Sequence, residues 1–279
     1  MTRYTDLIVE AANRLQDADV PNPDIDAWEL FAFAFRMDKK EYLMRMSEEA
    51  KDEEGVARYA EAIDLRCKRI PLQHITGEQG FMGLTFHVNE DVLCPRQDTE
   101  TLVEVALQRL LPGMHVLDLC TGSGCILISL LALAQDITGV GVDISEKALI
   151  VARENAWINR IDAEFLQGDL FAPVKGERFD MIVCNPPYIP SAVIPKLMPE
   201  VRDHEPRQAL DGDRDGLAYY RKITAQAHKY LKRGGYLIFE IGIGQRDAVA
   251  QMLFMNGYRD MICYRDYSEN ERVMLGRLE

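Results

Sequence analysis

The sequence contains no paired cysteine motif and few histidines. Its 279 residues include six cysteines and five histidines. No two cysteines are spaced as C-x-x-C, and the histidines do not cluster with them at the spacing of metal ligands. We therefore predict no metal site and interpret the cysteines as small buried side chains in a reducing compartment.

The chain also lacks long hydrophobic runs and an excess of positive charge. No apolar stretch is long enough to cross a membrane, and the first residues, MTRYTDLIVE, contain no apolar signal core. These features predict a cytoplasmic protein without a membrane partner. The formal net charge is −13. Proteins that hold nucleic acid by its phosphates usually have a basic surface, so we expect no direct nucleic-acid partner, whereas an acidic surface can attract a basic protein.

Three segments with different patterns indicate the domain organisation. In residues 1–75, apolar residues recur at helical spacing and predict a small helical bundle. Such a bundle could serve as a stabilising cap or as an N-terminal substrate-docking domain. In residues 76–94, glycines punctuate short apolar pieces and predict a linking β-hairpin. Residues 95–279 form the third segment, in which predicted strands and helices alternate.

This alternation predicts an α/β fold with a parallel, doubly wound sheet. Helical stretches lie between most of the candidate strands, and no internal repeat or low-complexity tract interrupts them. The candidate strands are His115–Leu119, Thr138–Asp143, Ala163–Gln167, Arg178–Asn185, Gly235–Glu240, Met261–Arg265 and Arg272–Arg277.

The first of these strands runs into a turn of small residues that opens an apolar helix. The turn reads Cys120-Thr121-Gly122-Ser123-Gly124. Its glycines let the backbone pass close to a ligand, and the free N–H groups at the helix start can bind a carboxylate. The loop lacks the third glycine of the dinucleotide pattern G-x-G-x-x-G, and the preceding Asp118 suits a ligand with ammonium and sulfonium groups. This favours S-adenosylmethionine as the cofactor, although a purely structural turn remains open.

Two further positions would complete a nucleoside site. Asp143 ends the second strand, where a carboxylate can accept hydrogen bonds from both ribose hydroxyls. The third strand leads to Gly168–Phe171, where an adenine could lie against apolar side chains. Taken without other context, these positions fit either a dinucleotide or S-adenosylmethionine.

The most specific motif follows the fourth strand and reads Asn185-Pro186-Pro187-Tyr188. Its position is the carboxyl end of a strand, where open α/β sheets bind ligands. The Asn185 side-chain oxygen and the Pro186 carbonyl could accept both N–H hydrogens of an amide, which would direct the nitrogen lone pair at a methyl donor. The Tyr188 ring could pack on the flat amide. We therefore predict that Asn185, Pro186 and Tyr188 are catalytic and that Asn185–Tyr188 bind the substrate.

Together these motifs resemble the class I S-adenosylmethionine-dependent methyltransferases. More narrowly, the chain resembles the peptide chain release factor glutamine N5-methyltransferases, the PrmC/HemK family. Beyond the N-P-P-Y motif, the resemblance is carried by Arg69–Gly77, Phe81–Leu84, Val92–Glu100, Glu205–Leu210, Asp215–Leu217, Phe239–Gly242 and Arg265–Ser268.

The resemblance implies a seven-stranded Rossmann-like sheet with an N-terminal helical bundle and a linking hairpin. It implies methyl transfer to the glutamine of a Gly-Gly-Gln motif in class 1 release factors, by a protein that is a monomer. Cys120–Gly124 would contact the amino-acid half of S-adenosylmethionine, Asp143 its ribose and Leu170 its adenine. Asn185 would touch both cofactor and substrate.

Departures from the family pattern and alternative functions remain. The family usually has glycine at the position of Cys120, so this residue must adopt the same backbone without glycine's freedom. Gln97-Asp98 replaces a proline-glutamate pair that is frequent in the family. One alternative is a glutamine methyltransferase acting on a ribosomal protein, and another is a DNA or RNA adenine N6-methyltransferase, since an exocyclic amine presents a similar NH2 group. A non-catalytic binding protein that kept the fold is a third.

Overall fold

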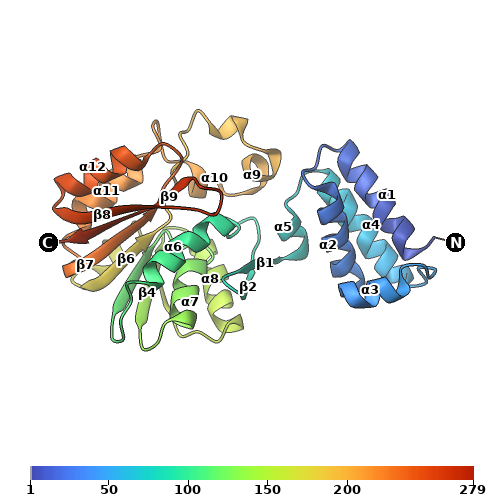
Figure 1. Cartoon of the computed structure of the whole chain (residues 1–279), viewed down its shortest axis with the longest axis horizontal. Coiled ribbons are helices and arrows are strands. Elements are labelled where there is room, and N and C mark those ends of the chain that lie inside the picture. Colours follow the sequence, from blue (N-terminus) through green and yellow to red (C-terminus); the bar gives the residue numbers. More distant parts are fainter. Residues whose placement is uncertain (1) are drawn as a thin grey trace. The chain divides into compact units, whose positions relative to one another are not determined.

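The computed structural model describes residues 2–279, which form two compact units (Figure 1). One unit comprises the residues up to Gly77 together with a later segment, Met198–His204. The other comprises Glu78–Leu197 and Glu205–Glu279. Within the described residues, no helix combines the length and the apolar character that a membrane span needs.

The second unit is built on a seven-stranded sheet with the strand order β5-β4-β3-β6-β7-β9-β8. The five strands from β5 to β7 pair in parallel, as the alternating pattern predicts. The seven predicted strands are all present. Their observed bounds are β3 (His115–Leu119), β4 (Thr138–Asp143), β5 (Glu164–Gln167), β6 (Phe179–Cys184), β7 (Leu231–Glu240), β8 (Tyr258–Arg265) and β9 (Glu271–Leu278).

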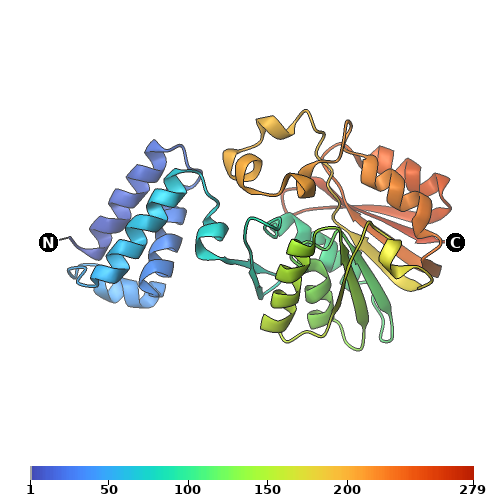
Figure 2. The ribbon, with the colours of Figure 1, turned by 180° about the vertical axis from the view of Figure 1, so that it is seen from behind.

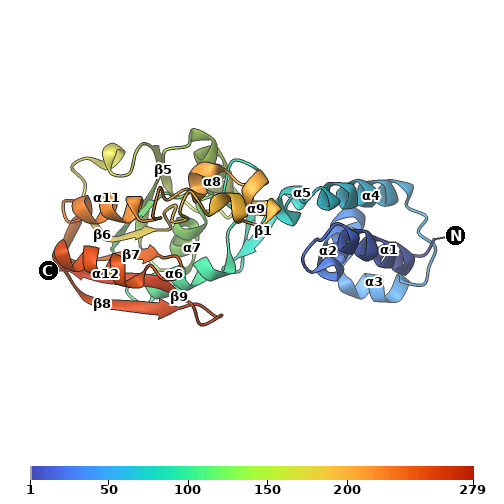
Figure 3. The ribbon, with the colours of Figure 1, turned by 90° about the horizontal axis from the view of Figure 1, so that it is seen from above.

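The last two strands depart from the predicted parallel arrangement. β9 runs antiparallel to both β7 and β8 and lies between them. The physical reason is the short connection between β8 and β9, because a parallel crossover needs a dozen or more residues. Figure 3 shows this red pair at the edge of the sheet opposite β5.

Helices cover both faces of the sheet (Figure 2). Alternate residues of a strand point to opposite faces, so Met181 and Val183 of β6 pack with α6 to α8, whereas Ile182 and Cys184 pack with α11 and α12. The bounds of the helices in this unit are α6 (Gln97–Leu107), α7 (Cys125–Leu133), α8 (Glu146–Ile158), α10 (Arg207–Leu210), α11 (Ala218–Ala227) and α12 (Arg246–Met255), with short 3-10 helices at Ala172–Val174 and Ile194–Lys196.

The predicted hairpin is present as β1 (Glu78–Phe81) and β2 (Leu84–His87). Its two-residue turn, Met82-Gly83, has positive φ at both positions, 51° and 78°, as a tight hairpin turn of this kind requires. Phe81 and Phe86 are buried in the hydrophobic cluster beneath α6 to α8. The hairpin is therefore anchored to the sheet unit by its aromatic side chains.

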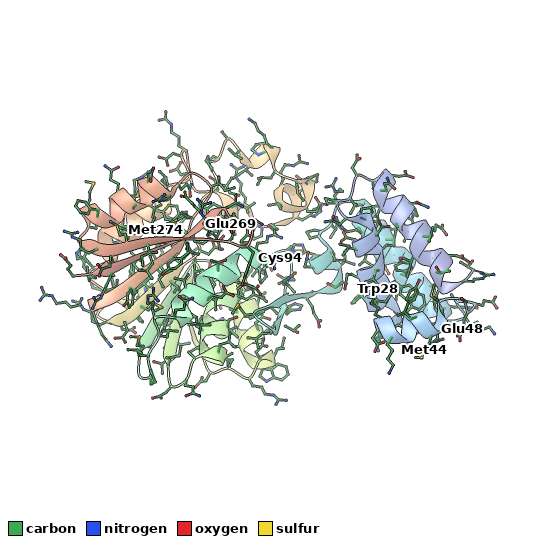
Figure 4. All side chains as sticks on the ribbon, viewed as in Figure 1. Trp28, Met44, Glu48, Cys94, Glu269 and Met274 are labelled. Carbon is green, nitrogen blue, oxygen red and sulfur yellow. The ribbon has the colours of Figure 1, made fainter. Side chains whose placement is uncertain are left out.

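The first unit is a helical bundle with an aromatic core. The ring of Phe31 lies 5.8 Å from that of Tyr4 and 5.7 Å from that of Tyr59, edge-on in both cases, and 5.9 Å from that of Trp28 (labelled in Figure 4). Aromatic pairs of this geometry contribute about 1 kcal/mol each beyond their buried area. The bundle consists of α1 (Tyr4–Asp17), α2 (Pro23–Phe35), α3 (Lys39–Arg45), α4 (Glu53–Cys67) and α5 (Leu72–Thr76).

A short helix from the second half of the chain, α9 (Pro199–His204), also belongs to the helical unit. Its Glu200 accepts a hydrogen bond from Arg66 at 2.9 Å and two from Arg69 at 2.6 and 2.7 Å. Arg66 also donates to Asp26 of α2 at 2.7 Å. This buried ionic cluster attaches α9 to the bundle, which no sequence pattern predicted.

Candidate active site

A cavity opens at the carboxyl ends of β3, β4 and β6. This edge is where open α/β sheets bind ligands. Three of the predicted site residues, Gly124, Pro186 and Tyr188, do not line it. The others come together around it, namely Cys120, Thr121, Gly122, Ser123, Asp143, Leu170, Asn185 and Pro187.

The loop after β3 approaches the cavity in a left-handed conformation. Cys120, Gly122 and Gly124 have φ values of 58°, 55° and 79°. A side chain on Gly122 would meet no atom within 4 Å, so the absence of one leaves that space free for a ligand. Cys120 adopts the same kind of backbone with a side chain, which is unfavourable for a residue other than glycine.

Gly124 serves packing. A Cβ atom there would approach Ile128 to 2.9 Å, Ala152 to 3.2 Å and Phe165 to 3.3 Å. The absence of a side chain lets α7 begin close against α8 and β5. Gly124 therefore shapes the loop from behind and does not face the cavity.

Asp118 organises the loop from within the protein. Its side chain is fully buried, and its Oδ2 accepts a hydrogen bond from the Thr121 hydroxyl at 2.6 Å. Burial raises the pKa of this carboxyl to about 7. Asp118 itself does not line the cavity, and its suitability for a ligand with ammonium and sulfonium groups stays a prediction.

Asp143 connects the loop after β3 to the end of β4. Its Oδ2 accepts a hydrogen bond from the Gly122 amide at 2.9 Å, and its Oδ1 accepts one from the Ser145 amide at 2.9 Å. A carboxylate offers about four acceptor positions, so these two bonds hold it in place and leave others for hydroxyl groups in the cavity. Burial raises the pKa of Asp143, while the backbone amides favour its ionised form.

The cavity has an apolar end beyond Asp143. It is lined there by Ile144, whose side chain is 51% exposed, and by Leu170 after β5. Leu170 has a φ of 51°, a conformation that turns the chain sharply after Asp169. Two aliphatic side chains beside a carboxylate are suited to a flat heterocycle joined to a sugar.

The segment Asn185–Tyr188, here called the acceptor loop, is held by a hydrogen-bond network that no sequence pattern indicated. Asn185 Nδ2 donates to Thr99 Oγ1 at 3.4 Å, and the Thr99 hydroxyl donates to Glu240 Oε2 at 2.6 Å. The Tyr188 hydroxyl donates to Glu240 Oε1 at 3.0 Å. The backbone carbonyl of Tyr188 also accepts a hydrogen bond from Gln245 Nε2 at 3.0 Å.

Glu240 is the centre of this network at the end of β7. Glu240 is only 2% exposed, and burial raises the pKa of its carboxyl group. The Thr99 hydroxyl, the nearby Arg272 guanidinium and the Tyr188 hydroxyl all favour the ionised form. Thr99 and Glu240 both lie in segments that carry the family resemblance, and this was the signal that could have pointed to them.

Arg96 lines the cavity and forms an ion pair with Glu205 at 2.5 Å. The Glu205 side chain is 1% exposed. Burial raises the pKa of Glu205, and the charge of Arg96 opposes that effect. The guanidinium is thus held at the edge of the cavity by a buried carboxylate.

Comparison with known proteins identifies similar chains. The methyltransferase small domain family matches residues 94–197, and the PrmC N-terminal domain family matches residues 6–77. A release factor glutamine methyltransferase of Geobacter sulfurreducens is 46% identical over 213 residues, which are 76% of this chain and 75% of the relative. A second, from Caulobacter vibrioides, is 39% identical over 270 residues, or 95% of this chain and 93% of the relative.

Among solved structures, a methyltransferase from Pyrococcus furiosus is similar with a TM-score of 0.53 and 15% identity. The match covers 70% of this chain and 89% of that one. At this identity the likeness concerns the fold alone, and it agrees with the seven-stranded sheet described above.

Proposed function

This chain belongs to the release factor glutamine methyltransferase family, and from that premise we propose that it transfers a methyl group from S-adenosylmethionine to the side-chain N5 of the glutamine in the Gly-Gly-Gln motif of a class 1 release factor. The observation that carries the proposal is the position of Asn185. It directly follows β6 and lines the same cavity as Asp143 and the loop after β3.

The cavity fits S-adenosylmethionine in three respects. Asp143 retains acceptor positions for ribose hydroxyls, and Ile144 and Leu170 provide an apolar surface for adenine. The missing side chain of Gly122 leaves room for the amino-acid half beside the loop. Bound there, the sulfonium would supply an electrophilic methyl group.

The acceptor loop supplies what an amide needs to act as a nucleophile. The lone pair of an amide nitrogen is delocalised, so the nitrogen must be held in one orientation toward the methyl group. Asn185, which lines the cavity, would accept one N–H of the glutamine through Oδ1. The Pro186 carbonyl could accept the other N–H only if the substrate amide reaches past the cavity lining. No strong base is needed before transfer, because the methylated nitrogen is acidic and releases its proton afterwards.

We further propose that the helical unit docks the release factor. The chain that leaves the acceptor loop at Tyr188 enters this unit at Met198, where the ionic cluster around Glu200 fixes it. A release factor bound to the helical unit would therefore contact the unit into which the chain runs from the acceptor loop.

The proposal is tested by mass spectrometry of a class 1 release factor after incubation with the protein and S-adenosylmethionine. We expect the Gly-Gly-Gln peptide to gain one methyl group on its glutamine. Parallel incubations contain ribosomal proteins or DNA. Methylation of either of these without methylation of the release factor would replace the proposal with a different substrate.

A further inference from the structure

The hydrogen bonds of Thr99 and Glu240 constrain the orientation of the Asn185 side-chain amide in the acceptor loop. Two hydroxyl groups, those of Thr99 and Tyr188, face the two oxygens of the Glu240 carboxylate at 2.6 and 3.0 Å. An ionised carboxylate has only acceptor positions, and both hydroxyls donate a hydrogen bond to Glu240. A hydroxyl has one hydrogen to donate, so the Thr99 oxygen can only accept a hydrogen bond from any other neighbour.

That neighbour is the side-chain amide of Asn185. Its oxygen and nitrogen have nearly the same shape, so only the hydrogen-bond network decides which of them faces which side. Because Thr99 can only accept, the NH2 group of Asn185 faces Thr99, at 3.4 Å. Within residues 2–279 no hydrogen bond reaches Asn185 Oδ1, and the residue lines the cavity.

We infer that Thr99, oriented by Glu240, is a positioning residue that fixes the polarity of the Asn185 amide so that its oxygen faces the substrate NH2 group. The inference rests on the proposed function and specifies how its site recognises a primary amide. With the opposite polarity, the NH2 group of Asn185 would face the NH2 group of the substrate, and two donors would meet without an acceptor.

Two substitutions of Thr99 separate polarity from packing. Thr99→Val keeps the shape of the side chain and removes the oxygen, so the partly buried Asn185 NH2 group loses its acceptor. Thr99→Ser keeps the oxygen and removes a methyl group. Polarity control predicts that Val is the more harmful change, whereas a packing role predicts that Ser is.

We expect Thr99→Val to lower kcat/KM for a release factor peptide about tenfold, because the partly buried NH2 group of Asn185 would be left without an acceptor. Thr99→Ser should keep kcat/KM within about twofold of the original value, because the serine hydroxyl can make the same two hydrogen bonds. The dissociation constant of S-adenosylhomocysteine, measured by calorimetry, should be unchanged in both variants. An equal or greater loss in Thr99→Ser would overturn the inference.

Thr101 supplies a matched control on the same helix. It is buried, and its hydroxyl has no hydrogen-bond partner in the described part of the chain. Thr101→Val removes the same atom without breaking a hydrogen bond, so kcat/KM should stay at its original value. A tenfold loss in this control as well would show that any buried hydroxyl on α6 matters and would contradict a specific role of Thr99.

Failure of the proposed function has a separate signature. If the unsubstituted protein did not methylate release factor, the proposed substrate would fail whatever the Thr99 variants do. If it did methylate release factor, and Thr99→Val were as active as Thr99→Ser, only the polarity inference would fail.

Discussion

Arg69 and Glu200 form a two-pronged ion pair, in which Nε and Nη2 of the arginine donate to the two carboxylate oxygens at 2.6 and 2.7 Å. The two residues are 131 positions apart in the chain. Pairs of this geometry are among the stronger hydrogen-bonded contacts in proteins. The contact therefore fixes the segment Met198–His204 to the helical unit.

Glu200→Gln should destabilise the helical unit, because it leaves the guanidinium groups of the buried Arg66 and the partly buried Arg69 with less negative charge beside them. Breaking a buried ion pair costs about 3–5 kcal/mol, and a hydrogen-bonding isostere should cost about half of that. Urea unfolding followed by circular dichroism measures the change. Glu10→Gln, at an exposed position of α1, is the control and should change stability by less than about 0.5 kcal/mol.

The same cluster predicts a dependence of stability on pH. Burial alone would raise the pKa of Glu200, but the hydrogen bonds from Arg69 and Arg66 outweigh it and the pKa is lowered. The contribution of Glu200 to stability is therefore complete above the ordinary glutamate pKa and declines as the pH falls below it. In Glu200→Gln this acid-dependent loss should be smaller, and an unchanged pH profile would contradict the assignment.

Asp143→Ala should weaken the binding of S-adenosylmethionine about 100-fold, the effect of losing two charge-assisted hydrogen bonds. Asp143→Asn keeps one acceptor oxygen, so its affinity for S-adenosylmethionine should lie between those of the original protein and of Asp143→Ala. Isothermal titration measures both affinities. Unchanged affinity in Asp143→Ala would mean that Asp143 only holds Gly122 and Ser145 and does not bind the ribose.

Asn185→Ala should lower the rate of methyl transfer by about 100-fold or more. Without the Asn185 side chain, the amide of the substrate glutamine is no longer held in line with the methyl donor. Binding of S-adenosylhomocysteine should be mostly retained, because Asp143 and the loop after β3 are intact. Single-turnover rates and calorimetry measure the two properties separately. Full activity in this variant would remove the mechanism proposed for the acceptor loop.

Cys120→Gly should make the protein more stable than Cys120→Ala by about 1 kcal/mol. Both changes remove the thiol, but only glycine adopts a φ of 58° without a steric cost. Comparing the two variants by thermal unfolding therefore isolates the backbone effect. Equal stability would show that the loop has relaxed out of the left-handed conformation.

Asp118→Asn should alter the pH dependence of stability in the neutral range. Burial raises the pKa of Asp118 to about 7, so between pH 4 and 7 the folded protein binds a proton that the unfolded chain has released. Stability should consequently fall as the pH rises through this range, by an amount on the order of a few kcal/mol. Asparagine does not titrate, so the fall should be smaller in Asp118→Asn when unfolding is measured from pH 5 to 8.

Local patterns in the sequence were sufficient to locate the strands and the two loops at their ends. The bounds of β3 and β4 agree with those predicted, because buried parallel strands are short apolar runs between turn residues. The positions of Asp143 and Asn185 follow from the same rule, since Asp143 is the last residue of β4 and Asn185 directly follows β6. The Gly122 and Asn185 loops could be brought to one cavity by this reasoning alone.

Contacts between distant segments had to come from the tertiary structure. Thr99 and Glu240 are 141 residues apart, and the sequence around neither residue shows that the two will form a hydrogen bond. The antiparallel β9, the attachment of α9 through Glu200 and the packing role of Gly124 are of the same kind. Periodicity reports which face of an element is buried, but the partner that covers that face is chosen by how the whole chain packs.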